Sequence, residues 1–149
     1  MALHIRTADA EGAAALNVIE THLLGLLERA NTARLDSGTN VLRIERRLTS
    51  AALDHALFLA EGGFLSHGGR HDSTPASRAE AVGYNWSRVG ENVLARTTAD
   101  ADEAYLQWWN SEGHRANLLE PAFIDCGLAR AYSPRVDCWY YVMLLAAPA

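Results

Sequence analysis

Two histidines and one glutamate of this sequence have the side chains best suited to metal binding or proton transfer. His67, Glu91 and His114 each stand among apolar and aromatic neighbours, and they lie far apart in the sequence. Two imidazoles and one carboxylate form a ligand set suited to zinc with one coordination position left open. They can act together only if the fold brings them together. Taken singly, each residue is better explained as a local cap or a loop hydrogen bond.

Glu91 is the strongest single candidate for a functional residue. It follows Gly90 and has apolar residues around it, so its carboxylate is expected to be partly desolvated. A desolvated carboxylate must find a cation, a metal ion or several N–H donors, or else take up a proton. This requirement makes Glu91 the candidate for a catalytic base. The alternative is a structural carboxylate that binds backbone amides, since Asn92 beside it favours tight turns.

The composition indicates one ordinary globular domain. The chain has 149 residues, of which 49% are hydrophobic and 21% charged, so we expect a single domain over residues 1–149, with residues 1–10 as a flexible extension. The net charge of −5 argues against a nucleic-acid surface. All 13 basic residues are arginine, which excludes lysine chemistry such as Schiff-base formation.

No segment of the sequence indicates membrane insertion or secretion. No apolar run is long enough to span a membrane, and the first residues carry acids and lack the apolar stretch of a secretory signal. Cys126 and Cys138 are the only cysteines. With a turn centred on residues 133–136, Cys138 faces a residue near Ala131. We therefore expect two free, mostly buried thiols.

Helical spacing of apolar residues and helix-end signals predict five helices. They are a helix over about 11–34, one over about 48–61 ended by Gly62-Gly63, a short one from Thr74-Pro75 to Gly83, one after the capping pair Asp100 and Glu103, and a short one from Ser111 to Pro121. His114 is the third residue of the last helix. His55 lies inside the second helix and is expected to be a packed histidine, and Arg78 is expected to tie the third helix to the neighbouring loop.

Extended segments are predicted between and after these helices. Residues 41–44 form a short link, a half-buried segment begins at Val93, and residues 122–146 form a β-hairpin. The second hairpin strand is apolar without alternation, which indicates burial on both faces. Helices on either side of a small antiparallel sheet would provide that burial. We therefore predict an α+β fold, a three-layer α-β-α sandwich with a small antiparallel sheet between helices.

Taken in order, the motifs resemble those of the SCP-like, or CAP, domain superfamily. The pattern is FLSH, TPxxR, GYxWxxxGEN, WWNSxGHRxNLLxPxF, a glycine and YYVM, and it covers about Leu26 to Leu145. The superfamily includes plant pathogenesis-related proteins, insect venom allergens, cysteine-rich secretory proteins and bacterial secreted domains, and the likeness is greatest to the bacterial branch. The resemblance specifies a fold more than an activity, because the superfamily hosts several unrelated activities.

The resemblance also implies a site. In this superfamily a central cleft commonly holds two histidines and two acidic residues, and the matching positions here are His67, Glu91 and His114. The position of the second acid aligns with Ser111, and Glu112 follows it, so this sequence departs from the complete set of four. The residues expected to line the cleft are Ser111, Glu112, Asn92 and Trp109.

Three functions from different classes follow from these residues. The first is a binding module that holds a divalent metal, with zinc expected and no organic cofactor, and presents a surface to a peptide, lipid or cell-envelope ligand. The second is a hydrolase, with Glu91 as the base of a metal-bound water or with Ser111 paired to His114. The third is a structural or interaction domain, or a sterol carrier, without metal. We expect a monomer. By the resemblance we expect an extracellular or cell-envelope location, with a cytoplasmic location as the alternative if the protein has no signal peptide.

Overall fold

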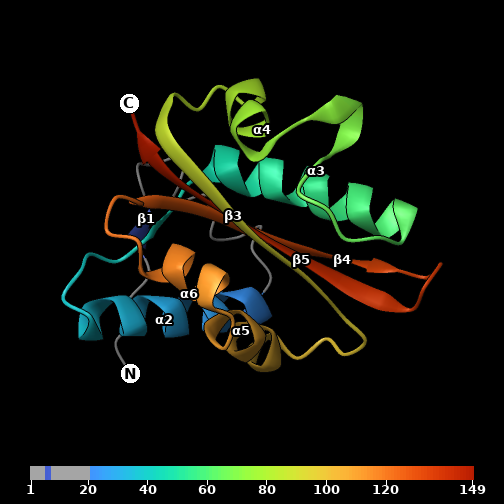
Figure 1. Ribbon diagram of the computed structural model, residues 1–149, viewed down its shortest axis with the longest axis horizontal. Coiled ribbons are helices and arrows are strands. Elements are labelled where there is room, and N and C mark those ends of the chain that lie inside the picture. Colours follow the sequence, from blue (N-terminus) through green and yellow to red (C-terminus); the bar gives the residue numbers. More distant parts are fainter. Residues whose placement is uncertain (1–5, 8–20) are drawn as a thin grey trace.

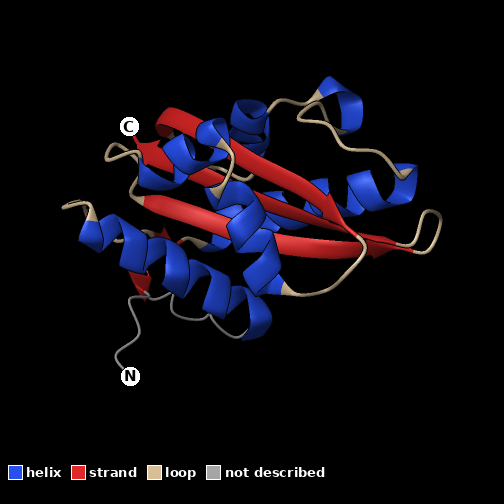
Figure 2. Ribbon diagram, turned by 60° about the horizontal axis from the view of Figure 1, so that its bottom comes forward, coloured by secondary structure: helices blue, strands red, loops and turns tan. Residues whose placement is uncertain are grey.

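The computed structural model describes residues 6–7 and 21–149, and in this part the chain forms three layers (Figure 1). A central sheet is covered on one face by helices α3 (Arg46–Gly62) and α4 (Pro75–Ala81). Its other face is covered by α2 (Thr21–Asp36), α5 (Ala101–Trp109) and α6 (Glu112–Leu119). Figure 2 shows the same arrangement with the strands between the two helical layers. The predicted α-β-α sandwich is confirmed.

The sheet has five strands in the order β1-β2-β4-β5-β3. The three long strands are β3 (Trp86–Arg96), β4 (Asp125–Ser133) and β5 (Cys138–Pro148), and they pair antiparallel around β5. Two short strands, β1 (Arg6–Thr7) and β2 (Arg43–Ile44), add parallel pairs beyond β4. The sheet is therefore mixed, and the antiparallel prediction describes only its three long strands.

Strand β5 runs through the middle of the core and is buried on both faces, as its apolar sequence predicts. Tyr141, Met143 and Leu145 face the layer of α2, α5 and α6. The alternate residues Val142 and Leu144 face α3 and α4. Side chains of a strand point alternately to opposite faces, so one continuous apolar strand supplies both cores.

Helix α3 lies directly on β4. A side-chain carbon added to Gly127 of β4 would meet the backbone of Leu48 and Thr49 at the start of this helix. Only glycine allows the helix and the strand to approach so closely. This contact fixes the distance between α3 and the sheet, and thus the position of the side chains that project from α3.

Local signals predicted most helix ends correctly. Helix α3 ends at Gly62 and is capped by Gly63, whose φ of 71° is the left-handed conformation that glycine adopts without strain. Thr74 caps α4 in a reciprocal capping box with Ser77. Asp100 caps α5 by accepting from two backbone N–H groups. Residues 11–20 of the first predicted helix, and 1–5 and 8–10 of the predicted extension, lie outside the described residues.

The cysteines are free, as predicted, although the hairpin register differs from the predicted one. Cys138 lies opposite Ser133, not near Ala131, because the turn occupies residues 134–137. Cys126 lies opposite Leu145 and is buried, and Cys138 is partly buried. Within residues 21–149, no helix has the length and apolar character that crossing a membrane requires.

Candidate functional site

The candidate site is built around Glu91 on the edge strand β3. The sequence predicted an extended segment from Val93, whereas the strand begins at Trp86, so Glu91 and Asn92 belong to it. Alternation along the strand directs Glu91 and Val93 toward α3 and α4 and directs Asn92 toward α6. The two neighbouring residues of β3 thereby reach both helical layers.

The carboxylate of Glu91 is buried and has partners on both oxygens. Its side chain is only 1% exposed. Arg78 Nη2 donates to Oε2 at 2.7 Å, and His67 Nδ1 lies 2.8 Å from Oε1. His55 Nε2 lies 3.9 Å from the same Oε1. The cation that a desolvated carboxylate requires is thus a guanidinium supplied by α4.

Arg78 connects α4, the loop before it and the strand. Besides Glu91, its guanidinium donates to the carbonyl of His67 at 3.0 Å and to the carbonyl and hydroxyl of Ser73 at 3.3 and 3.1 Å. Its side chain is 6% exposed. The predicted tie between this helix and the neighbouring loop is confirmed, and the tie also includes the carboxylate.

His67 presents a fixed ring to solvent. A carboxylate can only accept hydrogen bonds, so Nδ1 of His67 carries the proton that bonds Glu91 Oε1. In a neutral imidazole with its proton on Nδ1, Nε2 keeps a free lone pair. The side chain is 58% exposed, and since its Nδ1 edge abuts a buried carboxylate, the exposed edge is the one that carries Nε2.

His114 is paired with Ser111 at the start of α6. Ser111 occupies the cap position, as predicted, but its hydroxyl makes no capping bond to the backbone. Instead, Ser111 Oγ lies 2.9 Å from His114 Nδ1. Burial lowers the pKa of His114, and the nearby His67 imidazole lowers it further. The two imidazoles are therefore near enough to interact electrostatically.

Two asparagines fix α6 against the edge of β3. Asn92 is fully buried and donates to the carbonyl of His114 at 3.0 Å. Asn117 donates to Asn92 Oδ1 at 3.0 Å and to the carbonyl of Glu91 at 3.4 Å. Asn92 was predicted to line the cleft. Asn117 was not singled out, although it lies one helical turn after His114, on the same face.

The remaining predicted cleft residues, Trp109 and Glu112, form no hydrogen bond or ion pair with the Glu91 side chain. Trp109 is partly buried, with its ring stacked on Tyr105 at a centroid distance of 6.0 Å and the guanidinium of Arg115 5.9 Å from its centroid. Glu112 is exposed at the first position of α6. The second acidic residue of the family pattern therefore has no buried counterpart at Glu112.

His55 is part of the cluster, which the sequence did not indicate. It is fully buried, as predicted for a packed histidine. Its Nε2 lies 2.8 Å from the carbonyl of Ser66 and 3.9 Å from Glu91. The sequence signal was its place on the apolar side of a helix, which indicates burial but gives no information about neighbours from other elements.

The donor set suits a metal held by two imidazoles better than the predicted three-ligand set. Among the described residues, no three His, Cys, Asp or Glu side chains could hold one ion together. Both oxygens of Glu91 already bond protein donors, and Arg78 places a positive charge beside them. The Nε2 atoms of His67 and His114 have no hydrogen-bond partner among those residues. Glu91 fits as the carboxylate behind a metal-binding histidine.

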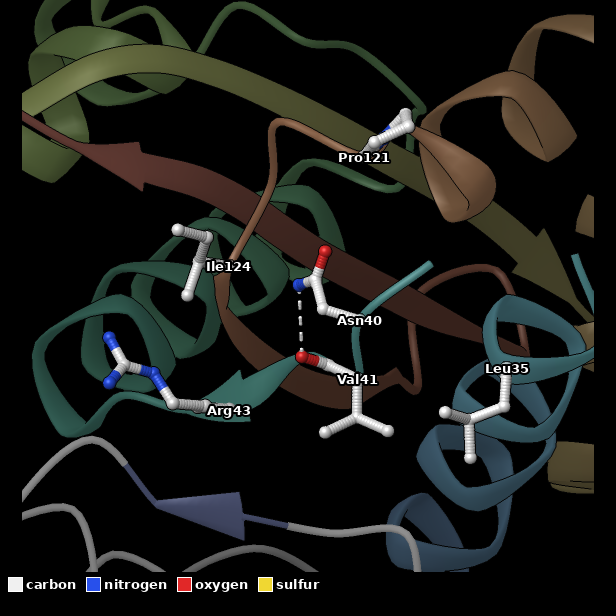
Figure 3. A pocket seen from close by; sticks show the side chains of 6 residues that line it. All are labelled: Leu35, Asn40, Val41, Arg43, Pro121 and Ile124. Atoms are coloured by element: carbon white, nitrogen blue, oxygen red, sulfur yellow. Dashed lines mark hydrogen bonds between the residues drawn. The ribbon is translucent and has the colours of Figure 1, made fainter. Parts of the chain in front are cut away.

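A separate cavity of about 360 Å³ lies at the other edge of the sheet, beside β2 (Figure 3). It is lined by Leu35, Asn40, Val41, Arg43, Pro121 and Ile124. Its two polar side chains are engaged, since Asn40 donates to two carbonyls and Arg43 pairs with Asp125 at 2.9 Å. No residue of the Glu91 cluster lines this cavity.

Comparison of the sequence with known families gives one assignment. The model of the cysteine-rich secretory protein family, CAP, matches residues 27–145. Among curated sequences, the chain is 27% identical over 103 residues to YkwD of Bacillus subtilis, a protein described as uncharacterised. The match covers 69% of this chain and 40% of YkwD, so the chain spans well under half of that relative.

Solved structures share the fold. An outer surface protein of Borrelia burgdorferi superposes with a TM-score of 0.78 at 20% identity, covering 88% of this chain and 97% of that one. An extracellular protein of Bacillus anthracis that contains an SCP domain gives a TM-score of 0.73 at 24% identity. That match covers 83% of this chain and 39% of the B. anthracis protein.

Proposed function

The chain belongs to the cysteine-rich secretory protein family, and on this premise we propose that it is a binding module whose His67 and His114 hold a divalent metal, with zinc the expected ion. Metal-binding histidines commonly donate their other ring N–H to a carboxylate, which fixes the tautomer and the ring orientation. The observation that carries the proposal is that His67 already makes this bond to a buried carboxylate while its ring is 58% exposed.

Neutral imidazole nitrogens, and not a net negative charge, would hold a cation in this cluster. Arg78 neutralises Glu91 on the inner side, so the carboxylate adds little net charge and the ion would be held through neutral nitrogen ligands. Burial and the neighbouring imidazole lower the pKa of His114, which keeps this ring neutral and able to bind metal at neutral pH. Imidazole is a preferred ligand of zinc.

Two protein ligands leave coordination positions free for an outside group. A peptide or cell-envelope ligand could supply carbonyl or carboxylate oxygens to them, which suits a module that recognises a partner. The solved relatives from B. anthracis and B. burgdorferi are described as an extracellular and an outer surface protein. By analogy we propose an extracellular or cell-envelope location for this chain.

The geometry favours binding over hydrolysis with Glu91 as base. A general base must come within hydrogen-bond reach of the proton that it removes. Glu91 is 1% exposed, and each of its oxygens bonds a protein donor. Because its side chain is so deeply buried, Glu91 is not accessible to a substrate or a metal-bound water.

Calorimetric titration of zinc into metal-stripped protein at neutral pH tests the proposal. We expect one ion per chain, and we expect His67→Ala and His114→Ala each to abolish the heat of binding. His22→Ala is the matched control, because His22 is an exposed histidine on α2 and its removal should leave the affinity unchanged. A wild-type protein that takes up no zinc, or variants that bind as well as the wild type, would contradict the proposal.

A further inference from the structure

We propose that His55 is a positioning residue for His67. Its buried neutral imidazole holds the carbonyl of Ser66 and thereby fixes the backbone from which the His67 ring projects. The consequence for metal affinity rests on the function proposed above, whereas the effect on the His67 ring can be measured without metal.

The proton of His55 is assigned by its partner. A backbone carbonyl can only accept, so Nε2 of His55 must donate to Ser66 O at 2.8 Å. Because that proton is directed to Ser66, it is not available to Glu91 Oε1, 3.9 Å away. Oε1 is thereby left to Nδ1 of His67, which bonds it at 2.8 Å. Two histidines stand near one carboxylate oxygen, and only one of them bonds it.

Two consecutive backbone carbonyls of the loop accept hydrogen bonds from buried side chains. His55 on α3 holds Ser66 O, and Arg78 on α4 holds His67 O at 3.0 Å. Both anchoring side chains are buried, at 0% and 6% exposure, while the ring of His67 is 58% exposed. An exposed side chain on a loop keeps one orientation only if its backbone is fixed. These two bonds supply that restraint.

The second nitrogen of His55 keeps the ring neutral. Nδ1 is buried and has no hydrogen-bond partner among the described residues. It faces Gly69, where an added side-chain carbon would stand 2.9 Å from it. A proton on Nδ1 would be a buried donor without an acceptor, which is costly. Burial accordingly lowers the pKa of His55. The charged or titratable side chains near this ring are those of Glu91, Arg78 and His67.

A neutral His55 is what the arrangement requires. A charged ring would carry its second proton on Nδ1, where it has no acceptor in the described part of the chain, and would add a buried positive charge beside Glu91 Oε1. The neutral ring instead acts as a single fixed donor. His55 touches neither the expected metal nor a partner, so it acts only through the backbone of residues 66 and 67.

The first test uses the metal-free protein and nitrogen-15 NMR of the imidazoles. In the wild type we expect His55 in the Nε2–H form and His67 in the Nδ1–H form, each as one tautomer. His55→Gln keeps a donor at similar reach, and His55→Met has similar length without one. We expect His67 to remain Nδ1–H in the Gln variant and to become a mixture of tautomers in the Met variant.

Three results of this NMR test would overturn the proposal. They are a wild-type His55 protonated on Nδ1, a folded Met variant in which His67 stays Nδ1–H, and a Gln variant as disordered at His67 as the Met variant. The first of these is read from the wild type, so it decides the matter even if the Met variant does not fold.

Zinc titration then connects His55 to the proposed function. Loss of a partner that orients a metal ligand typically weakens metal binding about 10- to 100-fold. We expect His55→Met to weaken zinc affinity by at least about tenfold and His55→Gln to stay within about threefold of the wild type. If the wild type binds no zinc, the proposed function fails, while the tautomer result still decides the role of His55. Equal zinc affinities in the Met variant and the wild type would overturn that role.

Discussion

Nδ1 of His67, an exposed ring on a loop, lies 2.8 Å from Oε1 of Glu91, a carboxylate that is almost completely buried in the sheet edge. The bond joins a rigid element to a solvent-facing nitrogen ligand. It fixes which nitrogen of His67 carries a proton, and it assigns Glu91 to the support of the site. Several measurable consequences depend on this arrangement.

Removal of the Glu91 carboxylate should destabilise the protein strongly. Glu91→Ala leaves Arg78 as a buried cation without its counter-ion, and breaking a buried pair in this way costs about 3–5 kcal/mol. Urea unfolding of the variant and the wild type measures the difference. The control is Glu112→Ala, an exposed acid in the first turn of α6, with an expected cost below about 1 kcal/mol. Equal small effects of both substitutions would contradict the structural role of the pair.

Two neighbouring glycines should differ sharply in their tolerance of alanine. A side-chain carbon on Gly69 would stand 2.5 Å from Ser73 Oγ and 2.7 Å from Arg78 Nη1. At Gly68 its nearest contact would be Ser66 Oγ at 3.4 Å. We expect Gly69→Ala to lower the free energy of unfolding by about 1–3 kcal/mol, and Gly68→Ala to change it by less than about 0.5 kcal/mol. If the two variants melt at the same temperature, the packing around Arg78 is not as described.

Acid should weaken the fold partly through His55. Burial lowers the pKa of His55 in the folded protein below its ordinary value of 6.5. The unfolded chain therefore binds the proton more readily, and this contribution to stability is complete above about pH 7 and is lost as pH falls through 6.5 toward the folded-state pKa. His55→Gln cannot titrate, so its free energy of unfolding should fall less between pH 7 and 5. Parallel pH profiles of the two proteins would contradict a buried neutral His55.

The proximity of the His67 and His114 imidazoles can be measured by titration. Burial is the first cause of the lowered pKa of His114, and the His67 imidazole is the second. His67→Ala should therefore raise the pKa of His114 toward 6.5 without restoring it fully, because the burial remains. Proton NMR of the ring as a function of pH gives both values. An unchanged pKa would mean that the rings are too far apart to share an ion.

The sequence allowed the framework to be predicted where a local signal decides the structure. Thr74-Pro75, Gly62-Gly63 and Asp100 marked helix ends correctly because capping depends on residues within one turn. The start of β3 was placed too late. Ser87 and Arg88 are exposed on this edge strand, and two polar residues follow Gly90, so an apolar run begins only at Val93.

The interior of the site could be predicted only in part. The need of Glu91 for a cation follows from its apolar surroundings, but the choice of Arg78 among the arginines depends on how α4 packs beside β3. Likewise, the closeness of His55 to Glu91 depends on the approach of α3 to the sheet at Gly127. Such long-range contacts leave no periodic pattern in the sequence.

The most direct test of the account is nitrogen-15 NMR of the histidine rings during a zinc titration of the wild-type protein. We predict that zinc shifts the Nε2 resonances of His67 and His114 to metal-bound values, while Nδ1 of His67 keeps its proton and its bond to Glu91. Binding of zinc through Nδ1 of His67, or spectra that zinc leaves unchanged at both rings, would contradict the central claim that Glu91 orients an open imidazole for a metal.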